Sequence, residues 1–244
     1  MIKTNEFDRK VSIITAVYNA ENHILNLINS LRQQIDKNFE WVVVDGLSTD
    51  STVKILKNID DLNITIISEA DFGIYDALNK GIKACTGEYY LVAGADDILY
   101  PNAVKDYKAA LEAHIGIVTA NIIIMNKVIK PNRGPSWRSG MFHWISQHSV
   151  GVLIKKSLHD IYGYYSKQYP IAADQLFIKN VCKNKVKCKK INSLVGEFGT
   201  NGTSSIDEIG GLTECFRIQL ITEKNKALQY LLFILRLLKR YIKT

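Results

Sequence analysis

The sequence contains only four cysteines, and their spacing argues against two common uses of this residue. Cys85, Cys182, Cys188 and Cys215 form no C-x-x-C pair and have no histidine close by. Neither a zinc site nor a disulfide framework is therefore indicated. We expect four reduced thiols, as in a cytoplasmic protein.

Long hydrophobic runs are absent as well. No uninterrupted apolar run approaches the roughly 18 residues that a membrane-spanning helix needs. The first ten residues, MIKTNEFDRK, mix both charge signs and contain no apolar stretch, so we expect no secretory signal there.

Two nucleotide-binding motifs are also missing. No G-x-G-x-x-G follows the first strand-like segment, and G-x-x-x-x-G-K-[ST] occurs nowhere in the chain. Rossmann dinucleotide binding and P-loop chemistry therefore both lose support.

The composition that remains is that of an ordinary globular protein. Of the 244 residues, 47% are hydrophobic and 23% charged, and the length allows one large α/β domain or two small domains. The formal net charge of +7 indicates anionic partners such as nucleic acid, phosphorylated metabolites or anionic lipid. Because the basic residues gather in the C-terminal tail without an aromatic-studded face, nucleic acid is not the expected partner.

Four apolar segments rich in β-branched residues alternate with helix-like segments. The strand-like segments are residues 11–17, 39–45, 63–68 and 88–95, and helical patterns lie between them at 21–34, from 48 onward and at 73–85. This alternation predicts a parallel sheet built from βαβ units. In such sheets, ligands bind at the carboxyl ends of the strands.

Carboxylates dominate the predicted strand ends, although the chain as a whole is basic. The polar residues there are Tyr18, Asn19, Asp45, Glu69, Asp71, Asp96 and Asp97. Like charges at one sheet edge raise their own electrostatic energy unless a cation offsets them. A divalent metal such as Mg²⁺ or Mn²⁺, shared with substrate phosphates, would do so. The alternative is that these acids are simply solvated strand-end residues.

Four segments in this order resemble the nucleotide-sugar domain of family 2 glycosyltransferases: VSIITAVYNAE, VVVDGLSTDST, GIYDALNKGI and GEYYLVAGADD. The resemblance covers roughly residues 10 to 205. It implies an α/β GT-A fold, like that of nucleotide-diphospho-sugar transferases, with a mixed sheet flanked by helices. The catalytic domain would span residues 1–205, with a donor half at about 10–100 and an acceptor half at about 101–205. Residues 206–244 would form a C-terminal amphipathic helical extension.

The resemblance also implies roles for individual residues. Thr15, Val17 and Tyr18 would frame the nucleobase, Asp45 would bond its edge, and Asp76, Asn79 and Lys80 would lie near the donor. Asp96 would face the ribose and the metal shell, and Asp97 would be the direct ligand of Mn²⁺ or Mg²⁺. The chain departs from the family pattern at Gly46 and Gly94, where the family often has further acids, and this leaves the donor open.

Inverting transfer needs a base that takes the proton from the acceptor hydroxyl. The segment YPIAADQLFIKNVCK places Asp174 at the start of a predicted helix, where the family keeps its catalytic acid residue. Asp174 is therefore the predicted base, although an acid at a helix start is also favoured by the helix dipole alone. His148, after Gln147, is a second-tier candidate near the metal or acceptor. The glycine-rich segment 196–205 is either an ordinary loop or one that closes over the site.

The C-terminal segment 225–244 is more apolar and more basic than the rest. One helical side collects Leu228, Leu231, Leu232, Leu235, Leu238 and Ile242, and the cations Arg236, Lys239, Arg240 and Lys243 gather elsewhere. Such a helix can lie on an anionic membrane surface. The alternative is a packing or dimer helix, so a homodimer is possible.

Together these patterns predict an inverting, metal-dependent hexosyltransferase of family 2. It would move a sugar from a nucleotide-diphosphate donor, most simply a UDP-sugar, to a glycan or polyprenyl-linked acceptor. The pathway would build a bacterial surface polysaccharide (lipopolysaccharide O-antigen, capsule or exopolysaccharide) at the inner face of the cytoplasmic membrane. A sugar-phosphate nucleotidyltransferase is disfavoured because no glycine-rich, arginine-containing loop follows the first strand. A catalytically silent nucleotide-sugar-binding or membrane scaffold protein is the alternative from another class.

Overall fold

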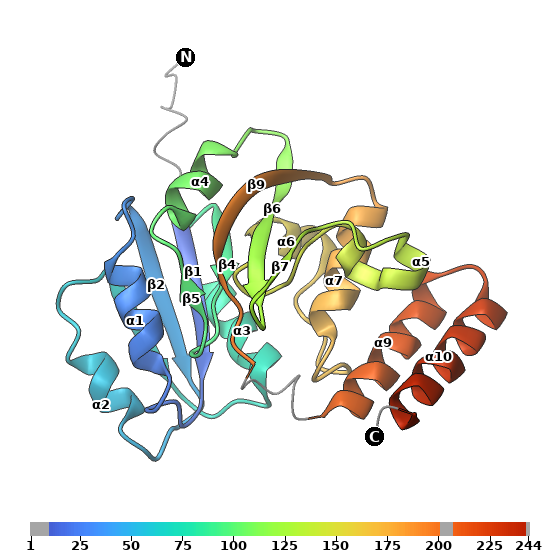
Figure 1. Cartoon of the computed structure of the whole chain (residues 1–244). Helices are drawn as coiled ribbons and strands as arrows, with labels where there is room; N and C mark the ends of the chain where they lie inside the picture. The colour runs from blue at the N-terminus through green and yellow to red at the C-terminus, as the bar shows by residue number, and fades with distance from the viewer. Residues whose placement is uncertain (1–9, 201–206, 243–244) are drawn as a thin grey trace.

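The computed structural model describes residues 10–200 and 207–242, and its first half follows the predicted βαβ pattern (Figure 1). The strands are β1 (Val11–Val17), β2 (Phe39–Asp45), β3 (Ile64–Ser68) and β4 (Tyr89–Val92), and the helices are α1 (Ile24–Arg32), α2 (Thr52–Lys57) and α3 (Ile74–Ala84). The four strands are parallel, in the order β3-β2-β1-β4. Val17, Asp45 and Ser68 are in register, so the carboxyl ends of β1, β2 and β3 meet at one edge.

The second half extends this sheet with strands of both directions. It adds β5 (Ile98–Leu99), β6 (Ile115–Ile124), β7 (Lys127–Ile129), β8 (Val152–Lys155) and β9 (Lys187–Glu197). Strand β8 is antiparallel to both β4 and β6, whereas β9 runs parallel to β6. The described residues thus form a nine-stranded mixed sheet in the order β3-β2-β1-β4-β8-β6-β9-β5, with β7 beside β6.

Helices cover both faces of the sheet because successive strand residues point to opposite sides. On one face, Ile13 and Trp41 pack with the apolar side of α1, where Leu27 and Leu31 are fully buried. On the other face, Ile14 and Val44 pack against α3 and the helices of the second half. The remaining helical segments are α4 (Ala103–Ala109), α5 (Ser136–Ser139), the 3₁₀ turn η1 (Gly140–His143), α6 (Leu158–Tyr162) and α7 (Ala173–Lys183).

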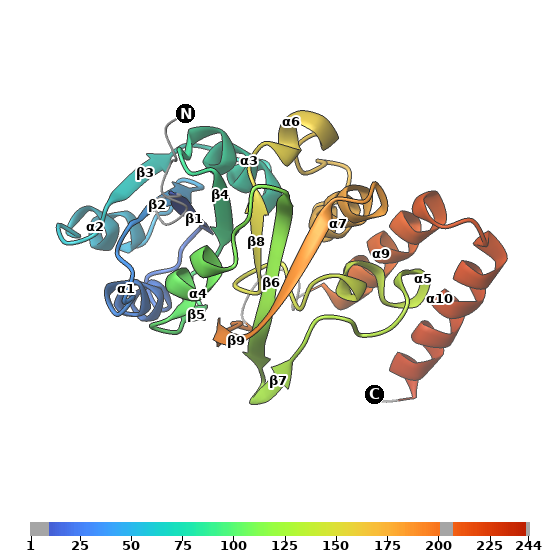
Figure 2. The ribbon, with the colours of Figure 1, turned by 90° about the horizontal axis from the view of Figure 1, so that it is seen from above.

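Two C-terminal helices pack beyond α7. Helices α9 (Glu208–Thr222) and α10 (Lys226–Tyr241) lie side by side, and α10 is the outermost helix at that end of the molecule in both views (Figures 1 and 2). Phe216 of α9 stacks on Phe233 of α10 with ring centroids 4.3 Å apart. Within residues 10–200 and 207–242, no helix is both long and apolar enough to cross a membrane.

Candidate active site

A cavity of about 850 Å³ opens where β4 ends. Asp96 and Asp97 line it from the turn after β4, and Asp174 lines it from the first turn of α7. His148, from the segment before β8, also lines it. The fold thus brings together four predicted site residues that lie up to 78 positions apart in the sequence.

The Asp97 carboxylate is held inside the protein. Its Oδ2 accepts hydrogen bonds from the Gly94 amide at 2.6 Å and the Ser149 hydroxyl at 2.5 Å, and its Oδ1 accepts from the Gly199 amide at 2.7 Å. Only 1% of the residue is exposed. Burial raises the pKa of Asp97 to about 7, although these hydrogen bonds oppose the shift. Its predicted role as direct metal ligand stays a prediction.

The Asp96 side chain is partly exposed and lies against Gly199, where a Cβ atom would overlap the carboxyl carbon. A glycine at position 199 therefore lets the chain after β9 approach both carboxylates. Phe198, Gly199 and Thr200 of the predicted loop 196–205 line the cavity, and residues 201–205 lie outside the described residues.

The two oxygens of Asp174 have different surroundings. Oδ1 accepts hydrogen bonds from the Tyr75 hydroxyl and the Gln175 amide, both at 2.8 Å. Oδ2 lies 4.0 Å from Nδ1 of His148. Burial and the Asp174 charge raise the pKa of Tyr75, so this hydroxyl stays protonated and donates. One oxygen is thus fixed in place, and the other faces His148.

A buried chain of polar contacts runs away from His148. Its Nε2 lies 2.6 Å from the Tyr165 hydroxyl, which lies 2.7 Å from the Tyr90 hydroxyl. Tyr90 in turn lies 2.7 Å from Nε2 of His159, whose Nδ1 lies 3.0 Å from the Gly163 carbonyl. Burial lowers the pKa of both histidines, that of His159 to about 4, so both rings are neutral at pH 7.

This series of hydrogen bonds determines which nitrogen of each histidine ring carries the proton. A carbonyl can only accept, so His159 is protonated at Nδ1 and its Nε2 accepts from Tyr90. Tyr90 then accepts from Tyr165, and Tyr165 accepts from Nε2–H of His148. The Nδ1 lone pair of His148 is therefore unprotonated and is directed toward Asp174.

The predicted nucleobase residues lie at the other strand ends, away from this cavity's lining. Thr15 is fully buried and its hydroxyl accepts from the Trp41 indole at 2.9 Å, so only its main chain could contact a ligand. Val17 is buried and Tyr18 is 65% exposed. Asp45 is fully buried, with Oδ2 accepting from the Ser68 hydroxyl at 2.6 Å, so it organises the loops of this edge.

The predicted donor residues of α3 make protein contacts. Asp76 pairs with Lys167 at 2.8 Å, and this hydrogen bond lowers the pKa of Asp76. Lys80 pairs with Glu69 at 3.0 Å. Asn79 is buried and forms hydrogen bonds with the main chain of Tyr165. It thereby positions the Tyr165 hydroxyl, which is the hydrogen-bond partner of His148.

Several cavity residues were not predicted from the sequence. Gln147 presents the one buried side-chain oxygen, within the described parts of the chain, that has no hydrogen-bond partner. Tyr75, Gln175 and Ser149 hold the two aspartates, as described above. Part of the wall comes from the C-terminal extension, through Cys215 and Gln219 of α9 and Arg236 and Arg240 of α10. Except for Gln175, which is adjacent to Asp174, no local pattern marks these residues, because they depend on contacts between distant segments.

The sequence profile described as Glycosyl transferase family 2 matches residues 12–174, which is more than half of the chain. The chain belongs to this family. A PGL/p-HBAD biosynthesis glycosyltransferase of Mycobacterium bovis is 28% identical over 212 residues, covering 83% of this chain and 78% of the relative. The resemblance inferred from the ordered motifs is thereby confirmed, and the chain is a family 2 glycosyltransferase.

Solved structures establish the fold. Staphylococcus aureus TarS 1–349 in complex with UDP-GlcNAc matches with a TM-score of 0.69 and 22% identity, covering 92% of this chain and 70% of that one. The mannosyltransferase PcManGT of Pyrobaculum calidifontis, in complex with GDP-Man and Mn²⁺, matches with a TM-score of 0.70 and 20% identity, covering 88% and 65%. The predicted GT-A fold is confirmed.

The structure gives two of the C-terminal cations a place. The sequence predicted that four cations of residues 236–243 gather off the apolar side of the helix, and Arg236 and Arg240 among them line the cavity. Arg236 donates a hydrogen bond to the Arg138 carbonyl, and Arg240 pairs with Glu208 at 2.6 Å. Helical periodicity separates the sides of a helix but does not say which side meets the protein.

Proposed function

We propose that this enzyme transfers a sugar, with inversion, from a nucleotide-diphosphate donor to a glycan or lipid-linked acceptor of a bacterial surface polysaccharide. The observation that supports this is one cavity lined by Asp96 and Asp97 from the donor half and by Asp174 from the acceptor half. Such an arrangement leaves room for a leaving diphosphate near the first pair and an acceptor hydroxyl near the third carboxylate.

Asp174 acts as the base in this proposal. Tyr75 and the Gln175 amide hold Oδ1, which leaves Oδ2 to accept the proton of the attacking hydroxyl. The unprotonated Nδ1 of His148, 4.0 Å from Oδ2, accepts a hydrogen bond from the same hydroxyl or from the protonated Asp174. The unpartnered oxygen of Gln147 accepts a further hydrogen bond from a substrate hydroxyl, because burying it without a partner costs free energy.

The residues after β4 fit a divalent metal that is shared with the donor. Within the described residues no group of three or more His, Cys, Asp or Glu side chains could hold a metal, so the donor's phosphate oxygens would complete the shell. Asp96 and Asp97, which both line the cavity, would supply carboxylate oxygens to this metal. Bound Mn²⁺ or Mg²⁺ would neutralise the departing diphosphate.

The donor is proposed to be a UDP-sugar, as in the TarS complex, although PcManGT holds GDP-Man. A panel of UDP-, GDP- and other nucleotide sugars, incubated with the full chain and Mn²⁺, should identify the donor by release of nucleoside diphosphate. Chelator should abolish both the release and donor binding in calorimetry. Equal donor affinity with and without chelator would remove the metal from the proposal. Donor binding without any turnover, with every acceptor tested, would favour the silent scaffold.

The outer side of α10 is proposed to rest on an anionic membrane surface at the cytoplasmic face. Leu231, Ile234, Leu235 and Leu238 are each 52–54% exposed and lie on one side of the helix. Lys239 is exposed beside them, and Lys243 lies outside the described residues. An apolar stripe with a flanking cation suits an interfacial helix. A second copy of the chain is the other possible occupant, which would make a homodimer.

A further inference from the structure

Arginines line the part of the cavity wall that α10, α5 and the segment before α5 form. They are Arg133, Arg138, Arg236 and Arg240. The chain contains only seven arginines against twenty-four lysines, yet none of the described lysines lines this cavity. Chance placement would favour lysine more than threefold. The planar, forked guanidinium is the cation that binds phosphate oxygens in pairs.

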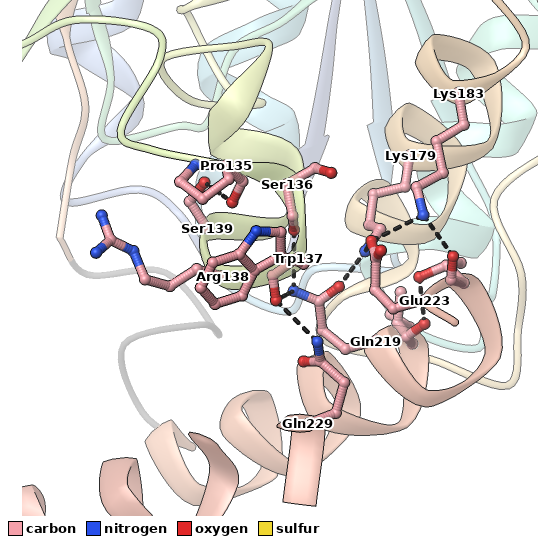
Figure 3. A network of polar contacts seen from close by, with 12 residues as sticks. Pro135, Ser136, Trp137, Arg138, Ser139, Lys179, Lys183, Gln219, Glu223 and Gln229 are labelled. Atoms are coloured by element: carbon pink, nitrogen blue, oxygen red, sulfur yellow. Dashed lines mark hydrogen bonds and ion pairs between the residues drawn. The ribbon is translucent and has the colours of Figure 1, made fainter. Parts of the chain in front are cut away.

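The scaffold beneath this wall is rigid. Gln219 of α9 and Gln229 of α10 donate hydrogen bonds to the backbone carbonyls of Ser136 and Trp137, and buried Lys179 of α7 donates to Gln219 (Figure 3). Glu223 pairs with Lys179 at 2.7 Å and so compensates its buried charge. Three helices therefore fix the α5 backbone from which Arg138 extends.

The Arg138 guanidinium is directed away from this scaffold (Figure 3). It lies over Gly134, whose φ of +117° favours glycine and where a Cβ atom would overlap it. Among residues 10–200 and 207–242, no hydrogen bond or ion pair engages this guanidinium. Arg236 donates a hydrogen bond to the backbone carbonyl of Arg138, and both residues line the cavity.

Three of the four guanidiniums on this wall have no ion pair with a carboxylate among the described residues. Glu208 is paired with Arg240. Arg133 contacts the Ser146 carbonyl and the Phe142 ring, the latter at 4.3 Å, and Arg236 contacts the Arg138 carbonyl. An anionic ligand would compensate the charge of Arg133, Arg138 and Arg236.

The wall lines the same cavity as the proposed base, Asp174. Arg236 and Arg240 lie outside residues 12–174, the part matched by the family profile, whereas Arg133 and Arg138 lie within it. Burial, together with the Asp174 charge, raises the pKa of the partly buried Cys215 thiol to about 11, and Arg236 opposes this shift, so Cys215 is within electrostatic reach of both residues. An anion bound by Arg236 would therefore lie close to the proposed base.

We propose that Arg138 and Arg236, assisted by Arg133 and Arg240, bind a phosphate or diphosphate group carried by the acceptor. This inference rests on the proposed function, because it takes the cavity to be the site of glycosyl transfer. It narrows the acceptor to phosphorylated molecules, either a lipid-linked diphosphate or a phosphate-containing glycan.

The test is calorimetric titration of inorganic pyrophosphate into the full chain, with chelator present so that no metal links it to Asp96 or Asp97. Wild-type protein should bind, and Arg138→Gln should weaken binding at least about tenfold, as expected for a lost charge-assisted contact. Arg138→Lys should restore only part of the affinity, because it keeps the charge without the fork. Arg217→Gln is the matched control, since Arg217 stacks on Tyr169 at 5.3 Å and does not line the cavity.

Donor affinity, measured with Mn²⁺ on the same variants, separates the two anion sites. The proposal expects Arg138→Gln to change donor affinity less than about threefold. If Arg138→Gln lowered the affinities for donor and pyrophosphate equally, the arginines would bind the donor's diphosphate and the proposal would be wrong. Unchanged pyrophosphate affinity in both Arg138→Gln and Arg236→Gln would also overturn it. If wild-type protein turns over no donor at all, the proposed function fails by itself, whether or not pyrophosphate binds.

Farnesyl diphosphate and inorganic pyrophosphate, compared on wild-type protein, distinguish the two carriers. Tighter binding of the prenylated compound, lost in Arg138→Gln, supports a lipid-linked acceptor. Equal affinity of the two compounds, also lost in Arg138→Gln, supports a phosphate-containing glycan. If the affinity for farnesyl diphosphate is unchanged in Arg138→Gln, the protein recognises only the prenyl tail, and this result would contradict the arginine site.

Discussion

At the scale of single residues, the two oxygens of Asp174 are not equivalent. Tyr75 and the Gln175 amide engage Oδ1, so the side chain cannot rotate without breaking two hydrogen bonds. As the proposed base, Asp174 would be oriented before the substrate arrives, which would lower the entropic part of the barrier. The remaining oxygen is the one that faces His148 and the cavity.

Asp174→Asn should therefore lower sugar transfer by about 10²-fold or more while leaving donor affinity near normal. The amide keeps the shape of the carboxylate but cannot accept the proton. Transfer is measured with labelled donor, and donor affinity by calorimetry. Asp160→Asn on the exposed side of α6 is the control. Near-normal transfer by Asp174→Asn would move the role of base to another group.

The hydroxyl of Tyr165 determines the tautomer of His148, so Tyr165→Phe should allow the other tautomer to form. Without an acceptor at Nε2, the proton can move to Nδ1, and the lone pair would no longer be directed at Asp174. We expect transfer to fall about tenfold. Nitrogen chemical shifts of the labelled imidazole should report the change of tautomer. Tyr164→Phe is the control, because Tyr164 stacks on His159 but takes no part in the series of hydrogen bonds between His148 and His159. Unchanged shifts in Tyr165→Phe would contradict the assignment.

At the scale of elements, Glu40 fastens β2 to β1 and to the turn before β4. Its Oε1 accepts from the Ser12 hydroxyl at 2.5 Å and the Gly87 amide at 3.0 Å, and its Oε2 accepts from the Thr86 hydroxyl at 2.9 Å. Burial alone would raise the pKa of Glu40, but these hydrogen bonds outweigh it and lower the pKa to about 2. The ionised form is therefore stabilised in the folded protein.

Because the pKa of Glu40 is lower when folded, its contribution to stability is present above pH about 4.5 and is lost as pH falls toward 2. Glu40→Gln should lower the melting temperature at pH 7 by about 4–8 °C, which corresponds to roughly 2 kcal/mol in a chain of this size. The deficit should shrink as the pH is lowered. Glu112→Gln, which breaks an exposed pair with Lys189, should change melting by less than about 2 °C. If Glu40→Gln lowered the melting temperature more at pH 3 than at pH 7, the ionised form of Glu40 would not be the stabilising one.

At the scale of the whole molecule, the C-terminal helices have two different sides. Their inner side completes the cavity through Cys215, Gln219 and Arg236, while the outer side of α10 exposes leucines. Removing α10 would thus also remove the Gln229 and Arg236 contacts to α5. Truncation after Asn225 is therefore a poor test of membrane binding, since it would disturb the cavity as well.

A triple substitution of Leu231, Leu235 and Leu238 by Gln tests the outer side alone. It should abolish sedimentation with anionic vesicles, because the lost apolar area contributes roughly 25 cal/mol per Å². Soluble donor turnover should persist, since these side chains do not line the cavity. The other outcome is that wild-type protein does not bind vesicles but forms a dimer, and that the triple variant stays monomeric. The apolar stripe would then be the contact with a second copy of the chain.

The sequence by itself determined the features that depend on near neighbours in the chain. The alternation of β-branched strands and amphipathic helices, the carboxylates directly after β4 and Asp174 at a helix start all follow from local periodicity and order. The predicted end of the fourth strand at residue 95 was too late, because Asp97 accepts the Gly94 amide and turns the chain after Val92.

Only the tertiary structure decided how these groups face each other. Tyr75 meets Asp174 across 99 positions, and Gly199 meets Asp97 across 102, so no local pattern could pair them. For the same reason the sequence indicated an amphipathic last helix but not that its arginines turn inward. A helix with an apolar stripe and a basic stripe can pack either one, and the polar partners supplied by α5 and α9 decided it here.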